Sequence, residues 1–200
     1  MQNMLAAVFG LSLLTPHAVS AQRAWGIGVE VGIERFWGAS GPLAGSDELA
    51  LRPYRPTHFG LRLDRGIGAV RVALSAGYAE SAVAGEYEGG ATVFSEGFTL
   101  VEVAPEAAIV LLRLGAGGAL RVFGGPVVRF WMPSEESART RIGARGGFEL
   151  EAPLGAGLSA VTRVHGAVGK SALETEDVPP GYEIRSMPSA GVSLGVRVGL

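Results

Sequence analysis

The sequence predicts an all-β protein, an antiparallel up-and-down transmembrane β-barrel of about eight strands. Three observations predict this fold class. Apolar residues alternate with small or charged residues in segments that are mostly ~9–13 residues long, the length of a tilted strand that crosses a bilayer. The connections between these segments alternate between long and short. An apolar segment of the kind that directs export precedes them all.

The first 21 residues have the layout of a secretory signal peptide. They contain no Lys, Arg, Asp or Glu, and an apolar run over 4–14 is followed by Pro16 and by small residues at 19–21. This run is too short for a membrane-spanning helix, which needs ~20 apolar residues. We therefore expect cleavage after Ala21 and a single barrel domain over 22–200. The alternative interpretation is a short buried helix at the start of a soluble domain.

The segment 25–34 shows the period of two that recurs along the chain. Trp25, Ile27, Val29, Val31 and Ile33 share one face, and the other face carries glycines and glutamates. In a helix each glycine would cost ~1 kcal/mol relative to alanine, whereas in a strand it leaves one face small. The same alternation predicts seven further strands, over 59–64, 70–78, 101–111, 120–130, 141–151, 158–169 and 192–200.

The connections between the predicted strands differ in length in a regular way. Long connections on one side and tight turns on the other are typical of outer-membrane barrels. The long or moderate connections cover 38–55, 79–96, 132–139 and 170–183, and the tight turns cover 65–68, 115–118 and 153–157.

The polar face of these strands indicates which side points inward. It consists of Gly, Ala and Ser with Glu and Arg in near balance, which suits the narrow, filled interior of an eight-stranded barrel. The apolar face would then contact lipid. We expect the inward charges to form a structural network, because charges removed from water must be paired, rather than to line an ion path. The predicted lumenal charges are Glu30, Glu34, Arg62, Asp64, Arg71, Glu102, Glu106, Arg121, Arg129, Arg145, Glu149, Arg163 and Arg197.

Aromatic residues gather near the ends of the predicted strands. Trp25 lies at one end, and six others lie beside the long connections. Outer-membrane barrels carry aromatic girdles at both membrane interfaces, so the sequence predicts such girdles here. The six residues beside the long connections are Phe36, Trp37, Tyr78, Phe98, Phe130 and Trp131.

The pattern resembles the small eight-stranded outer-membrane proteins, the group that contains the transmembrane domain of outer membrane protein A and the OmpX/Ail-like surface proteins. The resemblance covers essentially all of 22–200 and is architectural. Its most specific element is the final alternating strand, GVSLGVRVGL, which resembles the sorting signal that the barrel-assembly machinery reads. That family usually ends in an aromatic residue, whereas this chain ends in Leu200. The resemblance implies a bacterial outer-membrane location and biogenesis through that machinery.

The sequence gives no support for catalytic, metal or nucleic-acid chemistry. It has no cysteine and three histidines, too few for a histidine-rich metal site, and a net charge of -2 lacks the basic excess of a nucleic-acid binder. His58 near Ser40 in the first long connection is the nearest approach to a hydrolase dyad, and the His-x-Ser pattern of barrel deacylases fails at His165. We therefore expect no enzymatic activity, no catalytic residue, no metal and no cofactor.

The predicted function is a monomeric scaffold with a structural role or a surface-interaction role through its long extracellular loops. Its predicted partners are outer-membrane lipid and lipopolysaccharide. Two alternatives remain open. One is a soluble exported, lipocalin-like barrel that carries a small apolar ligand and has its apolar face inside. The other is a membrane-barrel lipid hydrolase.

Overall fold

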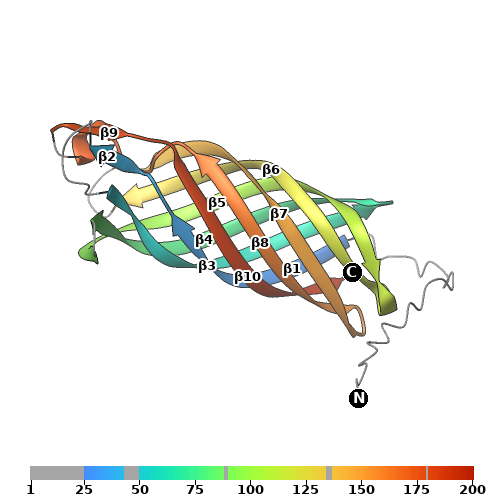
Figure 1. Cartoon of the computed structure of the whole chain (residues 1–200). Helices are drawn as coiled ribbons and strands as arrows, with labels where there is room; N and C mark the ends of the chain where they lie inside the picture. The colour runs from blue at the N-terminus through green and yellow to red at the C-terminus, as the bar shows by residue number, and fades with distance from the viewer. Residues whose placement is uncertain (1–24, 43–49, 88–89, 134–136, 179) are drawn as a thin grey trace, which may run out of the picture.

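The computed structural model describes residues 25–42, 50–87, 90–133, 137–178 and 180–200, and the predicted signal peptide lies outside them. Eight strands form one closed barrel in the order β1-β10-β8-β7-β6-β5-β4-β3, and all neighbours are antiparallel. Figure 1 shows them tilted around a common axis. The predicted up-and-down barrel is therefore confirmed. None of the helices in the described part of the chain has the length and hydropathy needed to cross a membrane.

The barrel strands are longer than the sequence pattern indicates, and two short strands and two 3-10 turns lie between them. The small strands β2 and β9 pair with each other outside the barrel sheet. The bounds in chain order are β1 Trp25–Phe36, β2 Ser40–Pro42, β3 Ala50–Ile67, β4 Val70–Tyr87, β5 Gly90–Leu114, η1 Gly115–Gly117, β6 Gly118–Pro133, β7 Arg139–Gly155, β8 Leu158–Gly169, η2 Thr175–Asp177, β9 Tyr182–Ile184 and β10 Met187–Gly199.

The long connections lie at one end of the barrel, here called the loop end, and the tight connections at the other, the turn end. Figure 1 shows β2 and β9 at the loop end and the C-terminus at the turn end. Tight turns follow β3, β5 and β7, as predicted. The backbone at Gly68 in the first of them has φ +63, a value that glycine adopts without steric cost.

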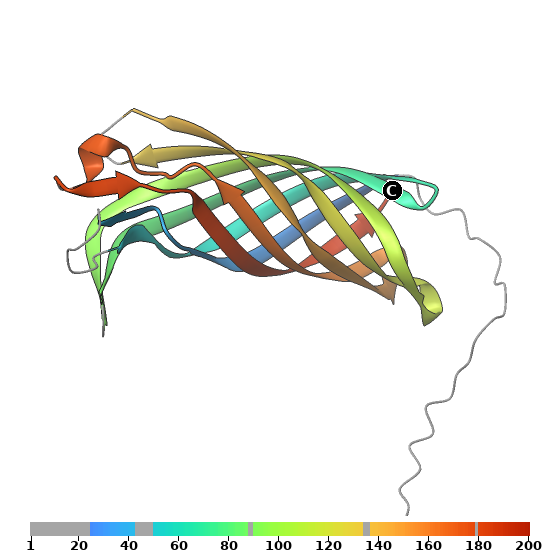
Figure 2. The ribbon, with the colours of Figure 1, turned by 45° about the horizontal axis from the view of Figure 1, so that its top comes forward.

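Two of the predicted long loops were wrong in part, because they contain strand. β4 and β5 continue past the barrel as a paired hairpin over most of 79–96, which Figure 2 shows projecting at the loop end. β3 likewise begins at Ala50, inside the predicted loop 38–55. In each case the register shifts, between Tyr54 and Thr57 and at Ala82/Val83. A bulge of this kind breaks the alternation of side chains, so the period of two is lost from the sequence.

The outer surface of the barrel is apolar. The outward apolar residues of β1 are between 44% (Trp25) and 63% (Ile33) exposed, and the other strands continue this belt around the barrel. An uninterrupted apolar belt of this extent is unfavourable in water and fits contact with lipid. The lipocalin-like alternative needs the opposite arrangement, with the apolar face inside, and is therefore wrong.

The limits of this belt can be placed on β1. Trp25 stacks with Arg65, 5.3 Å from the guanidinium carbon to the ring centroid, and Trp37 stacks in the same way with Arg35 at 5.4 Å. From Trp25 to Arg35 the strand rises ~33 Å along its axis, which is ~25 Å across a bilayer at a tilt of ~40°. These two pairs therefore lie at the two membrane interfaces, and Val31 lies near the midplane.

We predict that Val31→Arg lowers the stability of the folded barrel in lipid vesicles by about 2–4 kcal/mol, because it puts a charge at the midplane of the lipid-facing surface. Trp37→Arg is the matched control on the same face. It introduces the same side chain at the interface and should cost about 0–1 kcal/mol. Urea titration of vesicle-embedded protein measures both values. Equal losses for the two variants would contradict the placement of the belt.

Inside the barrel, glycine lies opposite the long charged side chains. Glu30 of β1 is paired with Gly195 on one side and with Gly60 on the other. Glu102 of β5 is paired with Gly77 in the same way. The absence of a side chain on the neighbouring strand leaves room for a long side chain to cross the narrow interior. This explains why a barrel with so many interior charges has so many glycines.

Candidate functional site

The thirteen predicted lumenal charges all lie in the barrel strands and all take part in ion pairs. At the loop end Arg129 donates from Nε to Glu102 and from Nη2 to Glu34, both at 2.8 Å. Closer to the turn end, Arg145 donates to both Glu102 and Glu106, and Arg163 donates to Glu106 at 2.6 Å. The remaining pairs extend to the turn end and involve Glu30, Arg62, Asp64, Arg71, Arg121, Glu149 and Arg197.

Glu149 lies at the centre of this network, with no exposed surface. Its carboxylate accepts a hydrogen bond from Arg62 and others from Arg71 at 3.1 Å and Arg121 at 3.3 Å. Arg163 Nε lies 3.7 Å away. Four guanidinium groups therefore surround one buried carboxylate. A charge in this position is stable only while its partners remain in place.

Glu151 belongs to the same network, although it is not among the thirteen predicted lumenal charges. It is 6% exposed, accepts a hydrogen bond from Arg121 Nη1 at 2.5 Å and forms an ion pair with Arg71 Nη1 at 2.9 Å. With Glu151 the network contains seven arginines and seven carboxylates among the described residues, so its formal charge is zero. The signal was present in the sequence, because Glu151 follows Glu149 by two residues and shares its face. We use "lumenal network" for the thirteen predicted residues together with Glu151.

The interior is densely filled in this region. A cavity of about 20 Å³ lies among Glu30, Arg62, Asp64, Arg163 and Arg197, which is room for about one water molecule. Phe123 also points inward, and the guanidinium of Arg163 stacks on its ring at 4.0 Å. Side chains thus occupy the barrel cross-section as expected for eight strands.

Three of the residues predicted to form an outer aromatic girdle point into the barrel instead. Phe36, Phe98 and Trp131 are 0%, 7% and 0% exposed, and Trp131 packs edge-to-face against both phenylalanines. The prediction was wrong for these three. Each has the strand parity of an inward charge, as Trp131 has that of Arg129, and parity decides which face a side chain occupies. Trp37 and Tyr78, in contrast, are exposed outside, as predicted.

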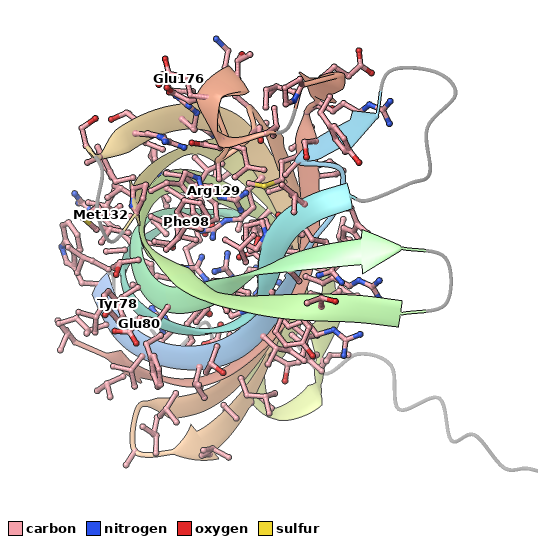
Figure 3. The ribbon with its side chains drawn as sticks, turned by 90° about the vertical axis from the view of Figure 1, so that its left-hand side faces the viewer. Tyr78, Glu80, Phe98, Arg129, Met132 and Glu176 are labelled. Atoms are coloured by element: carbon pink, nitrogen blue, oxygen red, sulfur yellow. The ribbon has the colours of Figure 1, made fainter. Side chains whose placement is uncertain are left out.

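These aromatics belong to a buried apolar cluster at the loop end, here called the apolar plug. Figure 3 looks into this end and shows Phe98 and Arg129 within the ring of strands, with Tyr78, Glu80 and Met132 toward its periphery. The plug covers the loop end of the lumenal network. Its members are Phe36, Ala39, Leu51, Ala79, Phe98, Leu100, Trp131, Ala172, Leu173, Val178 and Met187.

The connection 170–178 is fixed over the plug by two arginines of β7. Arg139 donates a hydrogen bond to each carboxylate oxygen of Asp177, from Nη1 to Oδ2 and from Nη2 to Oδ1, the latter at 2.9 Å. It also donates to the carbonyl oxygen of Ala172 at 3.1 Å. Arg141 donates to Ser171 O and to Glu174, each at 2.7 Å. Together with the β2–β9 pair, this connection forms a folded layer, here called the loop-end cap.

A hollow of about 820 Å³ lies between the cap and the loop ends of β7 and β8. Its apolar floor includes Ile142 and Val168, which are 68% and 50% exposed on the lipid-facing surface. Its polar rim includes Lys170, the only lysine of the sequence, and Glu176. An apolar floor that continues the membrane belt and ends at a charged rim is suited to lipid.

The structure does not bring together the residues of the candidate hydrolase dyad. His58 Nε2 and Ser40 Oγ are both buried without a hydrogen-bond partner among the described residues, so they do not bond to each other. His58 points into the barrel beside Gly77, and Ser40 lies in β2 of the cap. His165 also lies on the inward face of β8. In the described residues no group of three or more His, Cys, Asp or Glu side chains could hold a metal ion.

The chain shares its fold with solved outer-membrane barrels. The Neisserial surface protein A (NspA) superposes with a TM-score of 0.56 at 10% identity, over 88% of this chain and 97% of that one. The outer membrane protein OprG from Pseudomonas aeruginosa gives a TM-score of 0.50 at 12% identity, over 90% and 98%. No family model and no curated protein matches the sequence. The expected likeness to small eight-stranded outer-membrane barrels is therefore confirmed as a likeness of fold.

Proposed function

We propose that this protein is a non-enzymatic, monomeric outer-membrane scaffold that keeps its lumen closed and presents its loop-end cap and β4–β5 hairpin to the outside of the cell. The observation that carries the proposal is the contrast between the two faces of one barrel. The outer face is a continuous apolar belt, and the inner face is a neutral ionic network under an apolar plug. The apolar belt requires a membrane, and the filled lumen leaves little room for a solute.

The loop end is the part of the molecule suited to interaction with a partner. In outer-membrane barrels the long loops face outward and the short turns face the periplasm. Here the loop end carries the folded cap, held by Arg139 and Arg141, and the paired hairpin of β4 and β5. Rigid scaffolds commonly place their binding residues in such connections.

Lipopolysaccharide is the lipid partner that we propose for the hollow under the cap. Its acyl chains would lie over Ile142 and Val168, and its phosphates would approach Lys170 at the rim. The guanidinium of Arg141 lies at the same rim, although it is paired with Glu174 at 2.7 Å.

The experiment that tests the proposal begins with expression of the full chain in a Gram-negative host and separation of its two membranes. We expect the protein in the outer-membrane fraction with Gln22 at its N-terminus, migrating faster on a denaturing gel before boiling than after. Residues 22–200 refolded with and without detergent should show this heat-dependent shift only with detergent. A soluble product that needs no detergent would refute the proposal.

Two further measurements concern the scaffold role itself. In planar bilayers the protein should show no steady conductance, and conductance comparable to that of an open porin would refute a closed lumen. Hydrolysis of phospholipid and lipid A substrates should be undetectable. An activity lost in His58→Ala or His165→Ala would instead support the lipid-hydrolase alternative.

A further inference from the structure

A second hollow, of about 330 Å³, opens at the turn end of the lumen. Its walls are the tight turns after β3, β5 and β7, and its floor is the last layer of the lumenal network. We call it the turn-end vestibule. Its volume corresponds to about ten water molecules, enough for a small solute or the end of a chain. Gly68 and Gly157 lie in its walls, and Arg71, Arg121, Glu151 and Arg197 lie at its floor.

The floor of the vestibule places three guanidinium groups on one carboxylate. Glu151 lies 2.5 Å from Arg121 Nη1, 2.9 Å from Arg71 Nη1 and 3.6 Å from Arg197 Nη1. The two carboxylate oxygens of Asp64 accept hydrogen bonds from Nε and Nη2 of Arg197 at 2.8 and 2.7 Å. The network is neutral as a whole, but these two carboxylates face three arginines. Arg71 and Arg121 also pair with Glu149, which is buried deeper, so three carboxylates balance the three arginines. Among the residues that line the hollow itself, however, three are arginines and one, Glu151, is a carboxylate.

Several donors of these arginines have no protein acceptor. Arg121 makes its contacts to Glu149 and Glu151 through Nη1 alone, which leaves Nε and Nη2 without a partner among the described residues. Arg71 uses Nε and Nη1, which leaves Nη2. Arg62, Arg145 and Arg163 deeper in the barrel also have donors without a partner among the described residues, but those atoms are buried, whereas Arg121 and Arg71 line a hollow that is open to solvent. Both vestibule arginines are fixed in place, since Arg121 is 4% and Arg71 9% exposed.

We propose that the turn-end vestibule is a binding site for an oxyanion, a phosphate or carboxylate group that enters from the aqueous phase on the turn side. Arg121 and Arg71 would donate to it from their free N–H groups, and Arg197 would add positive charge. Guanidinium groups bind such oxygens with strong, charge-assisted hydrogen bonds. The hollow is open to solvent, so the group need not be removed completely from water.

The test uses inorganic phosphate as the probe, on the protein folded in detergent micelles at constant ionic strength. Isothermal titration should give saturable binding, and amide resonances of the turns at Gly68 and Gly157 should shift with the same midpoint. Acetate in a parallel titration distinguishes a general oxyanion site, which binds both, from a site selective for phosphate, which binds phosphate alone; either result supports the proposal. Binding that never saturates would overturn it.

Variants locate the site. Arg121→Gln should weaken phosphate binding about tenfold or more, the usual effect of losing a charge-assisted hydrogen bond. Glu151→Gln should strengthen binding, because it removes the competing carboxylate. Arg65→Gln removes a charge from the outer surface at the same end and should leave binding unchanged. An equal loss in Arg65→Gln and Arg121→Gln would overturn the proposal, since it would indicate diffuse attraction.

One pair of variants avoids the buried network, in case Arg121→Gln does not fold. Ala69 lies exposed on the rim, in the turn before β4. Ala69→Glu should weaken phosphate binding several-fold by adding a negative charge at the entrance, and Ala69→Gln should not. The heat-dependent gel shift verifies in each sample that the barrel is folded. Unchanged binding in Ala69→Glu would overturn the proposal.

Discussion

Glu149→Gln should be among the most destabilising single substitutions in this barrel, with an expected loss of about 3–5 kcal/mol. The side chain keeps its size but loses its charge, while four arginines remain within 4 Å of it in the barrel interior. An unbalanced positive charge then remains in the lumen, and the NH2 group that replaces one carboxylate oxygen cannot accept a hydrogen bond from an arginine. The urea concentration at the midpoint of unfolding in detergent micelles measures the loss.

Two controls show whether the loss comes from buried charge. Glu183→Gln breaks the pair between Glu183 and Arg185, whose side chains are about half exposed, and should cost about 0–1 kcal/mol. The double variant Arg62→Gln with Glu149→Gln restores neutrality and should recover part of the lost stability. A Glu149→Gln protein as stable as Glu183→Gln would show that the network does not hold the barrel together.

The faces of the strands could be predicted from the sequence because lipid imposes one requirement at every level of the barrel. Outward residues such as Ile33 and Leu194 must be apolar wherever they face acyl chains, so the alternation is continuous and the period of two is visible. The inward-facing charges could be predicted in the same way, because they occupy the alternate positions of the same strands. This is why all thirteen predicted charges lie in the lumen.

The pairing of those charges could not be predicted in the same way. Glu30 meets Arg163 and Asp64 meets Arg197, in both cases 133 residues apart in the chain. Such contacts depend on the stagger of the strands around the closed barrel, and a sequence shows alternation without showing stagger. Glu151 is different, since its parity was visible and its charge was needed to balance the seventh arginine.

The loop end shows where the sequence pattern ends. The folded connection between β8 and β9 depends on the contact of Arg139 in β7 with Asp177, 38 residues later in the chain, and no local periodicity records that contact. At Phe36 and Trp131 two sequence signals conflict. An aromatic residue near a strand end suggested a girdle, whereas its parity placed it inside.

Trp131→Ala should cost about 3–5 kcal/mol, since it removes from the centre of the apolar plug the largest side chain that is completely buried among the described residues. The cavity would adjoin Phe36 and Phe98, which both pack edge-to-face on the indole ring. The connection above rests on the same cluster through Leu173 and Val178. We therefore expect a lower urea midpoint together with faster hydrogen exchange in that connection.

Trp131→Phe distinguishes packing from polar contacts at this position. The indole Nε1 is buried and has no hydrogen-bond partner among the described residues, so its removal sacrifices no bond and relieves an unsatisfied donor. Trp131→Phe should therefore lose much less stability than Trp131→Ala. Trp37→Ala, which removes an exposed tryptophan at the same end, should leave hydrogen exchange in the cap unchanged. If Trp37→Ala loosened the cap as much as Trp131→Ala, the cap would depend on the membrane interface rather than on the buried plug.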